Sequence, residues 1–320
     1  MRENLSKDKI VKIRDINLGD GKPILIAGPC SIESRDHIIE EAKDLKKIGV
    51  DIVRGGAFKP RTSPFDFQGM GFEAVKFLDE ASKEAGVPVV TEVLSEDHVE
   101  LIKDYVDVFQ IGSRNMYNYA LLKKVGKTNK PVILKRGFSA TLKEWEMAAK
   151  YIEVEGNENI IFCERGIRTF ETEMRNTLDL AGAYMIKEKT GYPVIVDPSH
   201  GTGKRELIEP MVRAILALGL DGVMVEVHPN PDEAKSDAAQ TIGYDSYERI
   251  VKYFEEFNEN RIWWWLLLWK GSLRNYKSSG WKASLSGKTF RKTEEVLRIF
   301  RHFKGNWRRK NFRIYKIIRG

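Results

Sequence analysis

Three cationic residues lie within eight consecutive positions of the stretch 54–64, which reads RGGAFKPRTSP. Arg54 and Arg61 present fork-shaped donors and Lys59 presents a point charge, so that together they suit a phosphate or a carboxylate. The two glycines let the backbone approach a ligand closely, and the two prolines stiffen the loop. We expect this stretch to hold an anion. A solvated basic turn is the alternative when the stretch is considered alone.

A second candidate set could bind a metal. Cys30, His200, Glu226 and Asp237 offer one thiolate, one imidazole and two carboxylates, a donor set that suits a divalent transition metal. The sulfur and nitrogen donors favour Mn, Fe, Co or Zn over Mg or Ca. These residues are far apart in the sequence, so the alternative is a buried cysteine with unrelated polar neighbours.

Cations also follow several apolar runs. With the three named above, they form the set Arg54, Lys59, Arg61, Arg114, Lys135, Arg136 and Arg165. Burying so many cations at one place is reasonable only if anions bind there, either two phosphorylated groups or a phosphate and a carboxylate. A metal beside them would act as a Lewis acid on a carbonyl group. For any single cation, the alternative is an ordinary ion pair with a helix.

The elements that must position these residues recur regularly. Eight short β-branched runs are each followed by a stretch with helical periodicity. The runs are residues 23–30, 50–56, 87–93, 106–112, 131–137, 159–166, 192–200 and 221–229. Eight alternations of this kind predict an α/β fold, a single (β/α)₈ TIM barrel, with a doubly wound open sheet as the alternative. In a closed barrel the first and eighth strands are neighbours, so the four metal-site candidates could meet at one mouth.

Eight motifs carry a family resemblance. In chain order they are AGPC (27–30), RGG leading into KPRTS (54–63), GSRN (112–115), LKRG (134–137), CERG (163–166), DPSHG (197–201), EVH (226–228) and SDAAQ (236–240). Over roughly residues 20–257 the chain resembles the 3-deoxy-D-arabino-heptulosonate 7-phosphate (DAHP) synthases, in the short subgroup related to 3-deoxy-D-manno-octulosonate 8-phosphate synthase. The resemblance implies a transferase that joins phosphoenolpyruvate to erythrose 4-phosphate in the first step of the shikimate pathway, and that requires a divalent metal.

The resemblance also implies roles for residues. The metal ligands are Cys30, His200, Glu226 and Asp237, and the catalytic residues are Lys59, Cys30 and His200. Lys59 is our own candidate for the proton donor, because a lysine crowded by Arg54 and Arg61 should release its proton more readily. Arg54, Lys59, Lys135 and Arg165 hold phosphoenolpyruvate, helped at its phosphate by Gly112, Ser113 and Arg114. Erythrose 4-phosphate lies along Lys59, Pro60, Arg61 and Thr62. Asn115 indicates a homo-oligomer, a dimer or tetramer, and Glu92 has a supporting hydrogen-bonding role.

The choice of aldehyde depends on two of the motifs. The octulosonate relatives use arabinose 5-phosphate and read Lys-Ala-Asn-Arg where this chain reads KPRT at 59–62. KPRT and GSRN both have the form of the DAHP synthases, so we expect erythrose 4-phosphate. A non-catalytic sugar-phosphate sensor is an alternative of a different class, and the complete set of metal-site and cationic residues argues against it.

Charge and composition divide the chain. Residues 258–320 contain 17 Lys and Arg against 3 Asp and Glu, a net charge of +14, which leaves −7 for residues 1–257 of a chain whose net charge is +7. We therefore expect a leader at 1–21, a catalytic barrel at 22–257 and a basic, Trp-rich tail at 258–320. The leader leaves no room for a regulatory domain, so feedback inhibition through one should be absent. Residues 10–18 predict a strand or hairpin that caps the barrel.

The tail admits several interpretations. Its basic residues alternate with aromatic ones, which could bind nucleic acid or an anionic membrane, whereas we expect the barrel to bind neither. The alternatives are a disordered tail and residues read from a shifted coding frame. After Trp269 the sequence predicts little order until a basic amphipathic helix at 293–304. No apolar run reaches the ~18 residues of a membrane span, and the N-terminus has no signal core, so we expect a cytoplasmic protein.

Overall fold

The computed structural model describes residues 8–60, 63, 65, 67–274, 283–285 and 288–290, with side chains up to residue 259. The chain divides into two compact units, Met1–Asn260 and Arg261–Gly320. The first unit contains the barrel and all of the candidate site residues that the structure describes.

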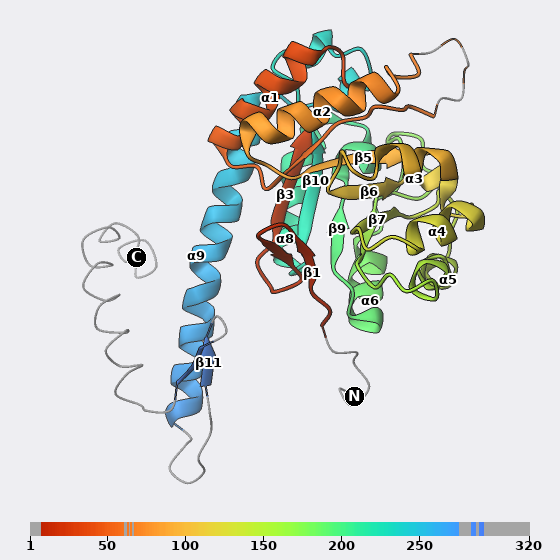
Figure 1. Cartoon of the computed structure of the whole chain (residues 1–320). Helices are drawn as coiled ribbons and strands as arrows, with labels where there is room; N and C mark the ends of the chain where they lie inside the picture. Colours follow the sequence, from red (N-terminus) through yellow and green to blue (C-terminus); the bar gives the residue numbers. More distant parts are fainter. Residues whose placement is uncertain are drawn as a thin grey trace. The chain divides into compact units, whose positions relative to one another are not determined.

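Eight parallel strands close into a barrel, which confirms the predicted (β/α)₈ architecture (Figure 1). In chain order they are β3 (Ile24–Gly28), β4 (Ile52–Arg54), β5 (Val89–Val93), β6 (Val108–Ile111), β7 (Val132–Lys135), β8 (Ile160–Glu164), β9 (Val194–Val196) and β10 (Gly222–Glu226). Each strand pairs with the next one, and β10 closes the barrel on β3 with Glu226 opposite Gly28. The first and eighth strands are therefore neighbours, as the metal-site prediction required.

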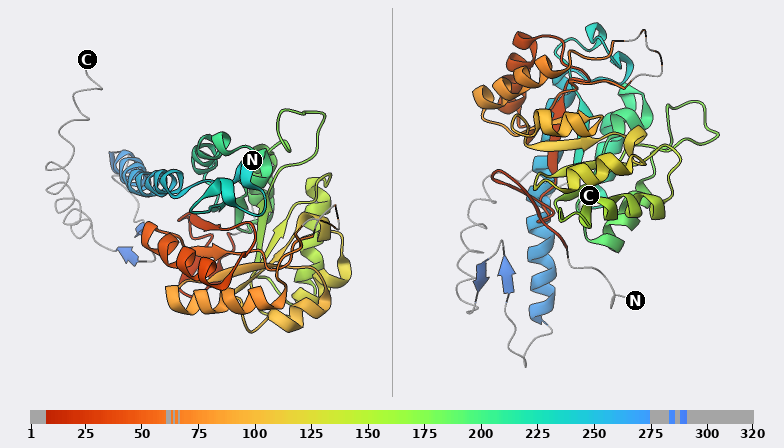
Figure 2. Two further views of the ribbon diagram at one scale, coloured as in Figure 1. Left: turned by 90° about the horizontal axis from the view of Figure 1, so that it is seen from above. Right: turned by 45° about the vertical axis from the view of Figure 1, so that its right-hand side comes forward.

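Helices surround the strands on the outside (Figure 2). They are α1 (Arg35–Ile48), α2 (Phe72–Ala85), α3 (Glu96–Ile102), α4 (Tyr119–Gly126), α5 (Leu142–Glu153), α6 (Leu180–Thr190), α8 (Ile208–Ala217) and α9 (Tyr244–Arg274), with a short α7 (Pro198–Thr202) after β9. Side chains cap several N-termini: Ser34 caps α1, and Thr141 forms a capping box with Glu144 in α5. Local sequence signals thus fix where these helices begin.

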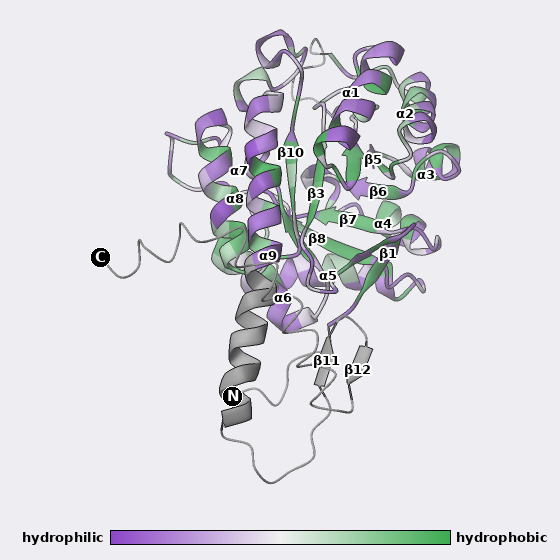
Figure 3. Ribbon diagram, turned by 90° about the vertical axis from the view of Figure 1, so that its left-hand side faces the viewer, coloured by the Kyte–Doolittle hydropathy of each residue, from purple (hydrophilic) through white to green (hydrophobic). Residues whose placement is uncertain are grey.

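Apolar side chains fill both faces of the strands. Residues such as Ile26, Ile133 and Met224 form a cluster inside the barrel, while Val53, Leu134 and neighbouring residues pack against the helices. In Figure 3 the strands are mostly coloured hydrophobic, whereas the helices carry both colours. This two-sided burial explains why the strands read as continuous apolar runs.

A hairpin packs into the interior cluster of the barrel. It consists of β1 (Val11–Ile13) and β2 (Ile16–Leu18), which pair in an antiparallel manner, and Val11, Ile13 and Leu18 are buried. The prediction of a capping hairpin within residues 10–18 is confirmed.

Three aspartates fasten the N-terminal ends of neighbouring strands. Asp51 precedes β4, and its Oδ2 accepts the backbone N–H of Leu25 in β3 at 2.8 Å while its own N–H donates to the Leu25 carbonyl at 3.0 Å. Asp107 does the same to Val89 in β5, and Asp221 to Val194 in β9. Each aspartate therefore satisfies both backbone groups of one residue in the preceding strand. We call this arrangement an aspartate clamp.

The region beyond Phe257 departs from the prediction. α9 continues to Arg274, so the predicted boundary at residue 257 falls within a helix, and β11 (Ala283–Leu285) pairs with β12 (Lys288–Phe290) where little order was expected. Leu, Trp and Arg at 261–269 tolerate or favour helix, and Thr289 and Phe290 favour strand, so local propensity is consistent with these elements despite the high positive charge. The helix predicted at 293–304 lies outside the described residues. No described helix has both the length and the apolar character needed to cross a membrane.

Candidate active site

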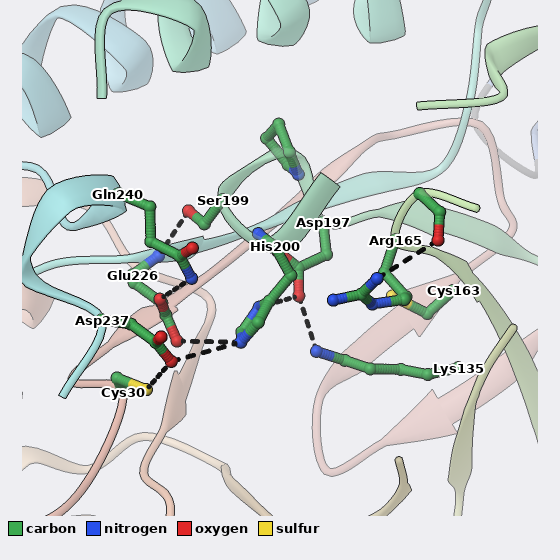
Figure 4. Close-up of polar contacts among 12 residues, drawn as sticks. Cys30, Lys135, Cys163, Arg165, Asp197, Ser199, His200, Glu226, Asp237 and Gln240 are labelled. Carbon is green, nitrogen blue, oxygen red and sulfur yellow. Dashed lines mark hydrogen bonds and ion pairs between the residues drawn. The ribbon is translucent and has the colours of Figure 1, made fainter. Parts of the chain in front are cut away.

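Four predicted metal-binding side chains meet at the C-terminal mouth of the barrel (Figure 4). One ligand atom from each of Cys30, His200, Glu226 and Asp237 lies within 4.8 Å of the others. Cys30 Sγ lies 3.0 Å from Asp237 Oδ2, and His200 Nε2 lies 3.3 Å from Glu226 Oε1. We call these four residues the quartet.

Asp197 orients the histidine of the quartet. It caps the N-terminus of α7, where its Oδ1 accepts the backbone N–H of His200 at 3.0 Å, and its Oδ2 lies 2.7 Å from His200 Nδ1. This contact turns Nε2 toward Glu226. Lys135 Nζ also donates to Asp197 Oδ2 at 2.6 Å. Burial opposes ionisation of Asp197, but His200 and Lys135 outweigh it and hold the pKa of this carboxyl well below its usual value.

The two carboxylates of the quartet are also held in place. Glu226 accepts from Arg54 Nη1 at 2.7 Å and from Gln240 Nε2 at 2.5 Å, so each of its oxygens has a partner. Arg175 Nη1 donates to Asp237 Oδ1 at 3.1 Å and to the Gln240 side chain at 2.7 Å. Asp237 has a left-handed backbone with φ 55°, which aspartate tolerates better than most residues.

The sequence interpretation assigned no role to Asp197, Arg175 or Gln240. Asp197 could have been identified from its own motif, because Asp-Pro followed by a short helix is an N-cap signal. Gln240 lies within the SDAAQ motif, but a neutral amide did not stand out among charged residues. Arg175 lies in the long loop after β8, and no local pattern connects it with Asp237.

Without a cation, the thiol of the quartet is protonated. Burial, and then the charge of Glu226, raises the pKa of Cys30 to about 12, although Lys59 opposes the shift. Burial also lowers the pKa of His200. For Glu226, burial favours the neutral acid, but His200, Arg54 and Lys59 outweigh it and lower the pKa. Two ionised carboxylates beside a thiol and an imidazole fit a divalent cation, whose binding would release the thiol proton.

Four predicted cations lie at this mouth of the barrel. Lys59 Nζ donates to Cys30 Sγ at 2.9 Å and to the Cys30 carbonyl at 3.0 Å. Arg54 and Lys135 are each only 5% exposed and are held by Glu226 and Asp197. Arg165, 3% exposed, lies near Lys135 in Figure 4 and donates to the carbonyl of Gly166 at 3.2 Å. The structure thus concentrates cationic groups around one mouth.

Arg136 is a correction to the predicted cation set. Its Nη1 pairs with Glu164 at 3.0 Å and with Asp179 at 2.8 Å, and its Nε donates to the carbonyl of Ala140. Two carboxylates already balance this guanidinium, so Arg136 has a structural role. Its position directly after Lys135 explains the error, because successive residues at a strand end point in different directions.

The GSRN motif follows β6 as a short 3-10 helix, η1 (Ser113–Asn115). Gly112 has no room for a side chain, since a Cβ there would lie 2.1 Å from Glu92 Oε1. Arg114 is exposed, Asn115 accepts from Asn118, and the buried hydroxyl of Ser113 has no hydrogen-bond partner among the described residues. A buried hydroxyl without a partner in this motif is consistent with a loop that binds a ligand.

Glu92 lies at the floor of the mouth. Gln110 donates to it at 3.1 Å, and a small pocket there is lined by Arg54, Gly55, Gly56, Lys59, Thr91, Glu92 and Gln110, among other residues. Burial raises the pKa of Glu92, although Lys59 and Lys135 oppose the shift. Pro60 is half-buried, whereas Arg61 and Thr62 lie outside the described residues.

Comparisons with known proteins agree on one family. The profile of the DAHP synthetase I family matches residues 4–261. The phospho-2-dehydro-3-deoxyheptonate aldolase of Thermotoga maritima is 46% identical over 251 residues, which cover 78% of this chain and 74% of that protein. The 2-dehydro-3-deoxyphosphooctonate aldolase of Bartonella henselae is 32% identical over 270 residues, which cover 78% of this chain and 95% of that protein. The crystal structure of the Thermotoga enzyme superposes with a TM-score of 0.77 at 44% identity, covering 79% of this chain and 74% of that one.

Proposed function

The chain belongs to the DAHP synthetase I family, and we propose that it condenses phosphoenolpyruvate with erythrose 4-phosphate to give DAHP and inorganic phosphate. The observation that carries this proposal is the quartet, whose ligand atoms lie within 4.8 Å of one another beside the buried cations Arg54 and Lys135. This combination suits a reaction between an aldehyde and a phosphorylated enol.

Cys30, His200, Glu226 and Asp237 hold a divalent metal in this proposal, with Mn, Fe, Co or Zn favoured over Mg by the sulfur and nitrogen donors. When bound, the metal would act as a Lewis acid toward the aldehyde oxygen. Asp197 contributes by fixing the ring of His200, and Gln240 by fixing Glu226. Such outer contacts orient metal ligands in many proteins.

The buried cations receive phosphoenolpyruvate. Arg54, Lys59, Lys135 and Arg165 bind its carboxylate and phosphate, and the loop Gly112–Arg114 adds the hydroxyl of Ser113 and the guanidinium of Arg114. Because Glu226 and Asp197 already orient Arg54 and Lys135, little rearrangement of these side chains is needed when the substrate binds.

Carbon–carbon bond formation then follows. C3 of phosphoenolpyruvate attacks the aldehyde carbon, the aldehyde oxygen takes a proton, and positive charge develops at C2. Lys59 provides that proton, since its Nζ reaches Cys30 Sγ at 2.9 Å and so lies at the quartet, where the aldehyde would bind. Water adds at C2 and loses a proton, and the resulting hemiketal phosphate expels inorganic phosphate to leave a ketone.

Erythrose 4-phosphate is favoured over arabinose 5-phosphate. Pro60, Arg61 and Thr62 follow the DAHP form of the motif, with Arg61 and Thr62 assigned to the sugar phosphate, and the relative of that activity is 46% identical against 32% for the octulosonate relative. Arabinose 5-phosphate stays the second candidate because the octulosonate relative is 32% identical over 78% of this chain.

The proposal includes a homo-oligomer, either a dimer or a tetramer. Asn115 lies in η1 beside the phosphate-binding loop, on a surface where Arg114 is exposed. A subunit contact at this position would complete the loop. Analytical ultracentrifugation of wild type and of Asn115→Ala tests the assignment: a wild-type monomer, or an unchanged assembly in the variant, would remove this role from Asn115.

A coupled assay of phosphate release tests the reaction. Phosphoenolpyruvate is supplied with erythrose 4-phosphate or with arabinose 5-phosphate, before and after treatment with a chelator. We expect phosphate release with erythrose 4-phosphate at least ~10-fold faster than with arabinose 5-phosphate, loss of activity on chelation, and recovery with Mn²⁺ or Zn²⁺. The reverse preference would reassign the enzyme to the octulosonate reaction, and full activity after verified metal removal would overturn the role of the quartet.

A further inference from the structure

Three arginines surround one phenylalanine at the mouth of the barrel. The guanidinium carbons of Arg165, Arg168 and Arg114 lie 4.7, 4.8 and 5.5 Å from the centre of the Phe138 ring. Phe138 follows β7, which lies between β6 and β8 in the barrel, and the arginines follow those two neighbouring strands. One aromatic ring thus contacts cations from the loops on both sides.

A backbone hydrogen bond also joins the two loops that carry Phe138 and Arg168. The N–H of Arg168 donates to the carbonyl of Phe138 at 2.8 Å, which ties the loop after β8 to the loop after β7. Among the described residues, neither Arg165 nor Arg168 forms an ion pair with a carboxylate. Burial also lowers the pKa of Arg165. The negative face of the Phe138 ring attracts the guanidinium groups that lie against it.

An anionic ligand would complete this cluster. Ser113, next to Arg114, has a buried hydroxyl without a partner among the described residues, so a hydrogen-bond acceptor or donor is missing there. The oxygens of a phosphate group can accept hydrogen bonds from the guanidinium groups of Arg114 and Arg165 and from the hydroxyl of Ser113. A leucine at position 138 could fill a similar space, but it has no negative face, and the guanidinium groups would separate under their mutual repulsion.

We propose that Phe138 is a positioning residue for phosphoenolpyruvate, whose ring holds Arg114 and Arg165 in the arrangement that receives the phosphate. The inference rests on the proposed function for the identity of the ligand. Phe138 does not contact the reacting carbons in this account. Its effect therefore falls on the binding of phosphoenolpyruvate more than on the chemical step.

The test compares three variants of the full-length, metal-loaded protein. Calorimetry gives the Kd of phosphoenolpyruvate, and the phosphate-release assay gives KM and kcat. In Phe138→Leu we expect Kd and KM for phosphoenolpyruvate to rise about tenfold, with kcat reduced less than about threefold. Phe138→Tyr keeps the ring face and should restore Kd to within about twofold. Phe170→Leu is the matched control, because Phe170 lies in the same loop as Arg168 but is 98% exposed. The Kd of phosphoenolpyruvate should be unchanged in this variant.

Several outcomes would overturn the inference. An unchanged Kd in Phe138→Leu would show that the ring does not position the arginines. A Phe138→Tyr variant as weak as Phe138→Leu would assign the effect to shape, and a fall in kcat with unchanged Kd would assign it to the chemistry. Thermal melting identifies a variant that has simply lost stability. If the wild type releases no phosphate from phosphoenolpyruvate, the proposed function fails, while the same comparison with inorganic phosphate as the probe still tests the ring.

Discussion

The two ends of the barrel differ in what their buried carboxylates mainly hold in place. At the N-terminal end, the clamps Asp51, Asp107 and Asp221 bind backbone groups of neighbouring strands. Asp107 and Asp221 also pair with Arg14 and Lys187. At the C-terminal mouth, Asp197 and Glu226 hold the cationic side chains of Lys135 and Arg54 and the imidazole of His200. Burial raises the pKa of Asp51 and Asp221, whereas the surrounding cations lower that of Asp197 and Glu226. One end is therefore arranged for stability and the other for ligand binding.

Replacing a quartet ligand should have the largest effect at the mouth. Cys30→Ser removes the soft donor, so we expect metal affinity to fall by at least ~100-fold and activity to follow. Metal content after dialysis, measured by mass spectrometry, checks the prediction. Cys163→Ser is the control, because Cys163 is buried in the barrel interior and is not part of the quartet. Unchanged metal content and activity in Cys30→Ser would remove Cys30 from the site.

Removing the proton donor should affect turnover. Lys59→Met keeps the length of the side chain but cannot transfer a proton, so we expect kcat to fall by ~10²–10⁴-fold. Metal content should be unchanged, which separates this variant from Cys30→Ser. Near-normal kcat in a variant that binds both substrates would assign proton transfer to another group.

A clamp at the opposite end should affect stability and leave chemistry intact. Asp221→Ala leaves the N–H of Val194 without its side-chain acceptor, so we expect the free energy of unfolding to fall by ~1–3 kcal/mol. The value of kcat/KM at 25 °C should change less than about twofold, since the substitution lies at the other end of the strand. Urea denaturation and the phosphate-release assay measure the two quantities. A variant as stable as wild type but inactive would contradict the division between the two ends.

The pH dependence of stability should have opposite signs at the two ends. The lowered pKa of Asp197 contributes stability that is present above the unfolded pKa of ~3.9 and is lost as pH falls below it. The raised pKa of Asp221 contributes stability that is present below ~3.9 and is lost as pH rises through the folded pKa. In chelated protein, Asp197→Asn should weaken the fall in stability toward acid, and Asp221→Asn should steepen it. Unfolding curves from pH 3 to 7 give the slope of stability against pH for each protein. If both variants changed this slope in the same direction relative to wild type, the comparison would be contradicted.

The smallest effect is expected from the second compact unit. All quartet residues and their hydrogen-bond partners among the described residues lie before residue 243, so a chain that ends at residue 260 should keep kcat/KM within about twofold. The same phosphate-release assay measures this value in both chains. Binding of DNA or anionic vesicles by the full chain, lost on truncation and weakened by salt, would show that the tail is a separate binding appendage.

The sequence allowed prediction of the barrel because its signals are local. Each of the eight apolar runs, and the helical stretch after it, depends on a few neighbouring residues. The quartet also followed, since strand order in a barrel decides which strand ends are adjacent. Arg136 and Arg175 could not be placed in this way. Their partners, Glu164 and Asp237, depend on side-chain direction and on the path of a long loop, and neither is encoded in local spacing.

The aspartate clamps have a consequence for how the barrel opens. Each clamp joins two strands that are consecutive in the chain, β3 with β4, β5 with β6, and β9 with β10, so it fastens a single strand–helix–strand segment. Partial unfolding should therefore begin at the unclamped seams and release whole segments. Native-state hydrogen exchange would then show the amides of Leu25, Val89 and Val194 exchanging together with the helices of their own segments, which makes these segments the cooperative units of the fold.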